Sequence, residues 1–315
     1  MKYRKSALFA LLFAFVFSTG VFAQAEPAFD FFSQFPKLRD FTMNASGDEA
    51  YFTIQSNLEE ISMIAVVKKK NGKWLKPELA PFSGKYKDME PFFSPDGLRL
   101  YFVSNRPLDI DAKETKDMDI WYLSRTSEKS DWSKPVNLGA PVNTKEDEFY
   151  PALALSGNIY FTKGIESQKG TSDIMFSSWN GEKYSAPVSL DSAINTEGEE
   201  YNAFIAPDES FLIFGGYRRP DGLGSGDLYI SFKNPDGSWR SAVNLGGKIN
   251  SKDMDYCPFV DMTSKTLYFT SRRSFVAPGP FETLNALEKE INRYENGQSR
   301  LYKVSIAEQL TKSVF

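Results

Sequence analysis

Four acidic residues recur along the chain at nearly constant spacing and are the first candidates for chemistry. Successive members lie 60, 52 and 55 residues apart, and the set is Asp88, Glu148, Glu200 and Asp255. Two carboxyl groups can cleave a glycosidic bond, and several together can bind a cation. A catalytic pair needs carboxyl groups in unequal environments, so regular recurrence favours a structural role. A glycoside hydrolase or polysaccharide lyase that uses these acids remains the alternative.

Arginines recur as well, each after an aromatic run that is typical of a strand. An aromatic ring beside guanidinium groups suits a binding surface. The predicted ligand-binding or partner-binding residues are Arg106, Tyr217, Arg218, Arg219, Arg272 and Arg273. The structural alternative is a lattice between blades, in which each recurrent acid pairs with an arginine of strand b or caps backbone donors.

Composition excludes several kinds of site. The 315 residues contain no His and a single Cys, Cys257, which excludes a His-based triad, a His-ligated metal and an intramolecular disulfide. The net charge of −4 provides no basic field for nucleic acid. The glycine-rich acidic stretch 221–227 is only a weak candidate for calcium, so we expect no cofactor. Without His, we also expect no charge-driven transition near neutral pH.

The first 23 residues have the pattern of a secretory signal peptide. Lys2, Arg4 and Lys5 precede an apolar run of eleven residues, Ala7–Phe17, and small residues occupy the cleavage positions of 21–23. The alternative is an uncleaved anchor, but a membrane span takes about 20 apolar residues. We expect a periplasmic or secreted protein that starts near Gln24 and has no later transmembrane segment.

The rest of the chain is a repeat. Each copy has a short apolar run, a turn rich in Ser, Pro, Asp or Gly, and a second aromatic run, as in Pro91–Phe93 and Leu100–Phe102. Four short strands per copy, here called a to d in chain order, predict one all-β domain over 24–315: a five-bladed β-propeller. The blades are expected to start near 41, 91, 151, 203 and 258. A β-sandwich would not require the same residues at a fixed long period.

The segment Pro91–Arg106 resembles the WD40-like repeats of the TolB propeller type, as do 119–122 and 132–139. The resemblance covers essentially all of 37–306. It implies an exported propeller that is usually non-catalytic and often interacts with proteins or the cell envelope. The chain shows neither the amino-terminal domain of TolB nor a peptidoglycan-binding domain, so we expect no role in the Tol system.

A propeller places the d–a and b–c connections on one face, so the recurrent acids should lie near the channel mouth beside the long b–c loops. The last blade lacks a strand d, and the predicted donor is 28–35, with the tail after Ile306 as competitor. Apolar residues at helical spacing predict a short helix within 281–295. We expect it to dock on the propeller, with a lid or partner-binding helix as the alternative.

Aromatic residues recur at the start of strand d, namely Trp74, Trp132, Tyr184 and Trp239. They could stack on carbohydrate, but their presence in every blade that has a strand d favours packing between blades. The sequence as a whole predicts an exported, non-catalytic protein that recognises a protein or glycan partner through its b–c loops. Loops carried on a rigid scaffold are the usual place for binding.

Overall fold

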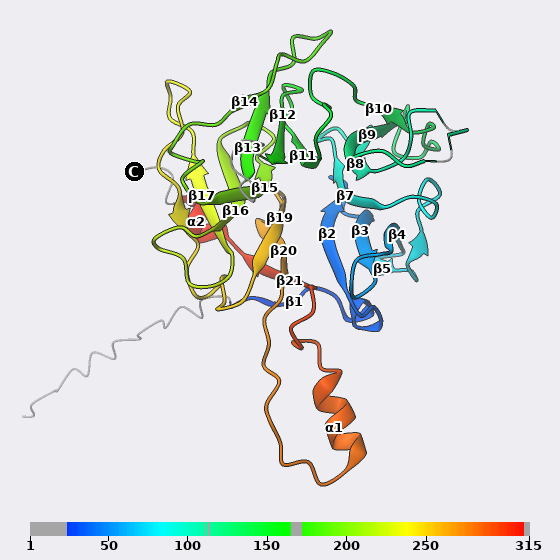
Figure 1. The fold of residues 1–315 in the computed structure, drawn as a ribbon, viewed down its shortest axis with the longest axis vertical. Helices are drawn as coiled ribbons and strands as arrows, with labels where there is room; N and C mark the ends of the chain where they lie inside the picture. The colour runs from blue at the N-terminus through cyan, green and yellow to red at the C-terminus, as the bar shows by residue number, and fades with distance from the viewer. Residues whose placement is uncertain (1–23, 110, 113, 165–171, 312–315) are drawn as a thin grey trace, which may run out of the picture.

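Each copy of the repeat folds into one antiparallel sheet, and five sheets form the blades of a β-propeller (Figure 1). The computed structural model describes residues 24–109, 111–112, 114–164 and 172–311. The predicted signal peptide, residues 1–23, lies outside the described residues. The inner strands β2, β7, β11, β15 and β19 contact one another in a closed ring. The predicted five-bladed propeller is therefore confirmed.

The strands follow chain order from the axis to the rim. Blade 1 consists of β2 (Leu38–Met43), β3 (Glu49–Gln55), β4 (Ser62–Lys70), β5 (Lys73–Trp74) and β6 (Glu78–Leu79). Blade 2 consists of β7 (Asp88–Phe93), β8 (Arg99–Ser104), β9 (Asp119–Ser124) and β10 (Val136–Asn137). Blade 3 consists of β11 (Glu148–Leu153), β12 (Ile159–Gly164), β13 (Ser172–Ser177) and β14 (Val188–Ser189).

The last two blades complete the ring. Blade 4 consists of β15 (Glu199–Ile205), β16 (Phe211–Tyr217), β17 (Asp227–Phe232) and β18 (Val243–Asn244). Blade 5 consists of β19 (Asp255–Asp261), β20 (Thr266–Ser271), β21 (Arg300–Ser305) and, from the other end of the chain, β1 (Glu26–Pro27). Glu26 is opposite Lys303 and Pro27 is opposite Tyr302.

Ring closure thus uses the N-terminal segment, but not the residues that the sequence predicted. The donor lies just before 28–35, which contains a 3-10 helix, η1 (Asp30–Gln34). The reason is aromatic packing: the ring of Phe32 lies 4.5 Å from Phe31 and 4.7 Å from Phe52, centroid to centroid. Burying these rings against blade 1 competes with extended pairing. The competing tail forms a short helix, α2 (Ala307–Thr311).

The predicted helix is present as α1 (Leu284–Ile291), and the Thr283 hydroxyl caps it by accepting a hydrogen bond from the Ala286 N–H at 3.1 Å. The prediction that it docks on the propeller is wrong. None of its residues is buried, and Figure 1 shows α1 standing away from the blades. Residues 274–299, here called the arm, have polar contacts of their own, such as Ala277 N–H to Glu290 Oε1 at 2.8 Å. These contacts connect the helix to the flanking segments of the arm.

A bulge interrupts every inner strand at the same place. The bulged residues have φ between 49° and 58°, a region that residues other than glycine rarely adopt. These five residues, here called the axial ring, are Asp40, Glu90, Tyr150, Asn202 and Cys257. Repetition of this unusual conformation in all five blades makes it part of the architecture.

Candidate functional site: the loop face and the central channel

Three of the four recurrent acids form buried ion pairs within their own blades. Arg106 Nη2 lies 2.7 Å from Asp88 Oδ1, Arg219 Nη1 lies 2.8 Å from Glu200 Oε1, and Arg273 Nη2 lies 2.9 Å from Asp255 Oδ1. Each guanidinium also donates to a backbone carbonyl of the preceding connection. These pairs link strand b to the d–a connection. The predicted pairing of acid and arginine is present, but it lies within blades rather than between them.

The fourth acid, Glu148, has no arginine partner among the described residues. It accepts hydrogen bonds from the hydroxyl and the N–H of Thr144, at 2.5 and 3.0 Å, and lies 3.7 Å from Lys163 Nζ. Burial raises the pKa of Glu148, and the hydrogen bonds from Thr144 oppose that rise. Its contacts are those of a turn that fixes the start of β11.

The Asn that precedes three of these acids by five residues explains their spacing. The Asn143 side chain accepts from the Ile120 N–H and donates to the Ile120 carbonyl, at 3.0 and 2.9 Å. Asn195 makes the same two bonds to Ile174, and Asn250 makes them to Leu228. The amide ties the d–a connection to strand c, so the motif serves the fold.

The predicted binding residues divide into two groups. Arg106, Arg219 and Arg273 are committed to the buried ion pairs, so they do not present a surface to a partner. Tyr217, Arg218 and Arg272 are exposed, and their side chains lie at the ends of β16 and β20. The guanidinium of Arg218 lies 5.5 Å from the ring centre of Tyr217. The binding prediction therefore rests on these three.

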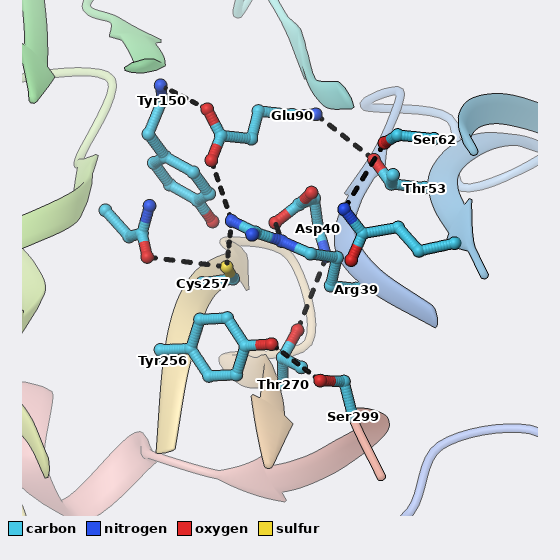
Figure 2. Close-up of polar contacts among 12 residues, drawn as sticks. Arg39, Asp40, Thr53, Ser62, Glu90, Tyr150, Tyr256, Cys257, Thr270 and Ser299 are labelled. Atoms are coloured by element: carbon cyan, nitrogen blue, oxygen red, sulfur yellow. Dashed lines mark hydrogen bonds and ion pairs between the residues drawn. The ribbon is translucent and has the colours of Figure 1, made fainter. Parts of the chain in front are cut away.

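A polar cluster in the channel was missed by the sequence analysis, and Figure 2 shows it. Arg39 precedes the axial ring residue of blade 1. Its Nε lies 2.8 Å from Asp40 Oδ1, and its Nη2 lies 2.7 Å from Glu90 Oε1 and 3.4 Å from Cys257 Sγ. One guanidinium thus joins side chains from blades 1, 2 and 5.

The axial ring also makes contacts across the channel. The second carboxylate oxygen of Glu90 accepts from the Tyr150 N–H at 2.7 Å, and the Tyr150 hydroxyl donates to the Pro258 carbonyl at 3.0 Å. The latter bond joins blades 3 and 5, which are not neighbours. Asp40 Oδ2 is buried without a hydrogen-bond partner in the described part of the chain. Side chains thus fill the middle of the channel.

Burial dominates the electrostatics of this cluster. It raises the pKa of Glu90 to about 7; Arg39 opposes that rise, and Asp40 adds to it. A buried carboxyl with this pKa can take the role of the missing His, which argues against the expectation of no charge-driven transition near neutral pH. Burial also raises the pKa of Cys257, which keeps the thiol protonated and unreactive.

Two of the four recurrent aromatic residues pack between blades, as predicted. Trp132 Nε1 donates to the Tyr51 hydroxyl of the preceding blade at 2.8 Å. Trp239 lies edge-on to Tyr160 of its preceding blade, with ring centres 6.4 Å apart. The rings of Trp132 and Trp239 are therefore engaged by neighbouring blades.

The described residues give little support for a metal site. They contain no group of three or more His, Cys, Asp or Glu side chains placed to hold an ion. In the stretch proposed for calcium, Asp227 Oδ2 accepts hydrogen bonds from the Leu223 N–H and from Asn244 Nδ2. Asp221 Oδ1 accepts from the Tyr229 hydroxyl at 3.1 Å. Calcium binding at this stretch stays a prediction.

No protein-family model and no curated protein matches this chain. A solved glycoside hydrolase shares 9% identity over 90% of each chain, with a TM-score of 0.55. The endo-arabinase from Bacteroides thetaiotaomicron VPI-5482 shares 17% identity over 87% of this chain and 95% of that one, with a TM-score of 0.53. The putative TolB from Agrobacterium tumefaciens shares 16% identity over 78% of this chain and 74% of that one, with a TM-score of 0.47.

This chain is a five-bladed β-propeller. The two structures with TM-scores above 0.5 are similar to it in fold. At these identities the likeness to solved structures establishes the fold alone, and the activities of the two hydrolytic enzymes do not transfer to this chain.

Proposed function

We propose that this protein is an exported, non-catalytic β-propeller that binds a partner protein through its b–c connections. The described b–c connections are 56–61, 105–109, 111–112, 114–118, 218–226 and 272–299, here called the loop face. One observation carries the proposal: exposed apolar side chains gather there. Nine of the 17 large exposed hydrophobic residues lie in these connections, namely Leu58, Ile61, Leu108, Leu223, Phe275, Val276, Phe281, Leu284 and Ile291.

A protein fits this face better than a glycan does. The exposed residues are mostly aliphatic, and they lie in the same connections as Arg218 and Arg272. Exposed apolar patches with polar surroundings mark protein interfaces, in which Tyr and Arg are enriched. The tryptophans that could stack on sugars are packed between blades instead.

The arm strengthens the case for a protein partner. Leu284 and Ile291 are 68% and 54% exposed. They belong to α1, in which no residue is buried. An isolated helix of eight residues is marginal in water, so a preformed one suits a groove on another protein.

The buried acids support a non-catalytic role. Arginines neutralise three of the recurrent acids, and the single guanidinium of Arg39 forms ion pairs with both Asp40 and Glu90 in the channel. The proposal of export rests on the signal pattern of 1–23. Among the described residues, no helix is long and apolar enough to cross a membrane.

Site-directed photo-crosslinking in the producing cell tests the proposal. A photoreactive amino acid replaces Leu58, Leu108 or Leu284 on the loop face, and Val188 or Val243 on the rim as exposed controls. We expect one adduct of common mass from the loop positions and none from the rim. Adducts from the rim alone, or from neither set, would overturn the proposal.

A further inference from the structure

The channel has a second end, which is apolar and hollow. A cavity of about 180 Å³ opens between the a–b turns, on the face opposite the loop face. Every blade contributes to its wall, through Met43, Phe92, Leu155, Phe204, Phe259 and Met262. No contact of the Arg39 cluster reaches it, so it is a separate site.

Three phenylalanine rings form the wall nearest the axis. The ring centres of Phe92 and Phe204 lie 6.3 Å apart, and those of Phe204 and Phe259 lie 5.8 Å apart. Each ring follows an axial ring residue by two positions and lies just past the bulge of its strand. These rings belong to blades 2, 4 and 5 and therefore meet across the axis.

The size of the hollow limits what can enter. An apolar cavity of about 150 Å³ is large enough to bind benzene. This cavity is slightly larger, and its outer wall is accessible because Leu155 and Met262 are 67% and 39% exposed. An apolar group about the size of one phenyl ring matches it.

The charge around the hollow decides the rest of the ligand. The a–b turns cover 44–48, 94–98, 154–158, 206–210 and 262–265, and their only basic residue is Lys265. Acids are more numerous: Asp48, Asp96, Asp208 and Glu209 lie in the turns, and Asp261 lines the hollow itself. Lys233 neutralises Glu209 at 2.7 Å and Lys69 offsets Asp48, which leaves Asp96, Asp208 and Asp261 to set the sign of the rim. A negative rim attracts cations.

We propose that this hollow binds a small organic cation, with a phenyl-sized group against Phe92, Phe204 and Phe259 and an ammonium group beside Asp261. The turn holds the Asp261 carboxylate in place, because Oδ1 accepts from the Thr263 N–H at 2.9 Å and Oδ2 from the Ser264 hydroxyl at 2.7 Å. This site is independent of the loop face and of the protein partner proposed for it.

Methionine methyl NMR on the mature chain offers a local readout. Met43 and Met262 line the hollow, whereas Met89 and Met254 lie near the other end of the channel. The probes are phenethylamine, the neutral 2-phenylethanol and the anionic 3-phenylpropionate. We expect phenethylamine to shift the Met43 and Met262 signals saturably, with a dissociation constant on the order of 1 mM. The alcohol should bind roughly two- to fivefold more weakly, and the anion more weakly still.

Three variants separate the two components of binding. Leu155→Ser should weaken the amine and the alcohol alike, because it removes an apolar wall. Asp261→Asn should weaken the amine alone, since an amide can still support the turn. Asp236→Asn is the matched control: Asp236 accepts from the Ser238 N–H at 3.0 Å in a similar turn but does not line the hollow.

Three results would overturn the proposal. The first is the absence of any saturable shift at Met43 and Met262. The second is binding of 3-phenylpropionate as tight as that of the amine. The third is an equal loss of amine binding in Asp261→Asn and Asp236→Asn.

Discussion

The buried charges of this propeller fall into two sets that differ in how they repeat. The pairs Asp88–Arg106, Glu200–Arg219 and Asp255–Arg273 have the same geometry in three blades. The channel cluster occurs once and joins Asp40 and Glu90 through the single guanidinium of Arg39. The repeated set links strands within a blade, whereas the single cluster links different blades.

This difference shows what repetition means in a propeller. A side chain that recurs with the same partner performs the same local task in each blade. The axial ring recurs in position but not in residue type, so each blade adds a different group to one shared channel. Each acid of the three repeated pairs has its own arginine, while two channel acids share one. The following predictions test that contrast, from the largest expected effect to the smallest.

Arg39→Met should have the largest effect, because it leaves two buried carboxylates without a counterion. We expect the free energy of unfolding at pH 8 to fall by about 5 kcal/mol. The loss should be smaller at pH 5, where Glu90 can take up a proton. Urea denaturation at both pH values measures this. The half-exposed Arg272 in the same channel mouth provides the control, and Arg272→Met should cost no more than about 1 kcal/mol. Equal effects of the two variants would contradict the assigned role of Arg39.

Arg106→Met should have a smaller effect, because it leaves only one buried carboxylate, Asp88, without its counterion. A buried pair that loses one partner costs about 3 kcal/mol at the lower end of the usual range. The matched comparison is Arg218→Met, which breaks the exposed pair with Glu199 and should cost at most about 1 kcal/mol. Denaturation at pH 8 decides between them. A loss for Arg106→Met larger than that for Arg39→Met would reverse the proposed ranking.

Glu90→Gln should change how stability depends on pH. The pKa of Glu90 is raised in the folded protein, so this carboxyl contributes stability that is fully present below about pH 4.5 and is lost as the pH rises through about 7. The free energy of unfolding of the parent should therefore fall relative to the variant between pH 5 and 8, on the order of 2 kcal/mol.

The control for this titration is Glu60→Gln. Glu60 is exposed, and a hydrogen bond from Ser56 lowers its pKa, so it should not titrate between pH 5 and 8. Thermal melts of the three proteins at several pH values provide the comparison. Parallel curves for the parent and Glu90→Gln would show that Glu90 stays ionised throughout this range.

The combined Leu284→Asp and Ile291→Asp variant should have the smallest effect on stability. Neither side chain is buried, so we expect a change within about 0.5 kcal/mol. Loop-face crosslinks formed from Leu58 should nevertheless be lost, because the arm no longer offers an apolar stripe. A large drop in the melting temperature would mean that the helix packs on the blades in solution.

The sequence was sufficient to predict the propeller because the blade repeats contain the same residue types at fixed positions. One example is the Asn that precedes three of the four recurrent acids by five residues, since its amide bonds to strand c. The axial ring has no recurrent residue type, because Glu90, Tyr150, Asn202 and Cys257 differ in chemistry. A positional rule would have found them: each follows a recurrent acid by two residues.

The helix shows a different limit of sequence analysis. Its periodicity predicted an apolar stripe correctly, but a stripe does not specify the surface that covers it. Polar contacts within the arm, including that of Glu290 with the Ala277 N–H, connect the helix to its own flanking segments. Ring closure likewise depended on the packing of Phe31 and Phe32. This packing competes with strand pairing, and it is not part of the repeat pattern that the prediction used.

The central claim is that the buried acids maintain the ring while binding belongs to the loop face. The most direct test is the crosslinking yield from a photoreactive residue at position 284, compared between the parent and Glu90→Gln. Both proteins would be folded, as judged by circular dichroism. The account predicts equal yields and the same adduct mass. Loss of the adduct from a folded Glu90→Gln protein would contradict it, because the channel acids would then take part in binding.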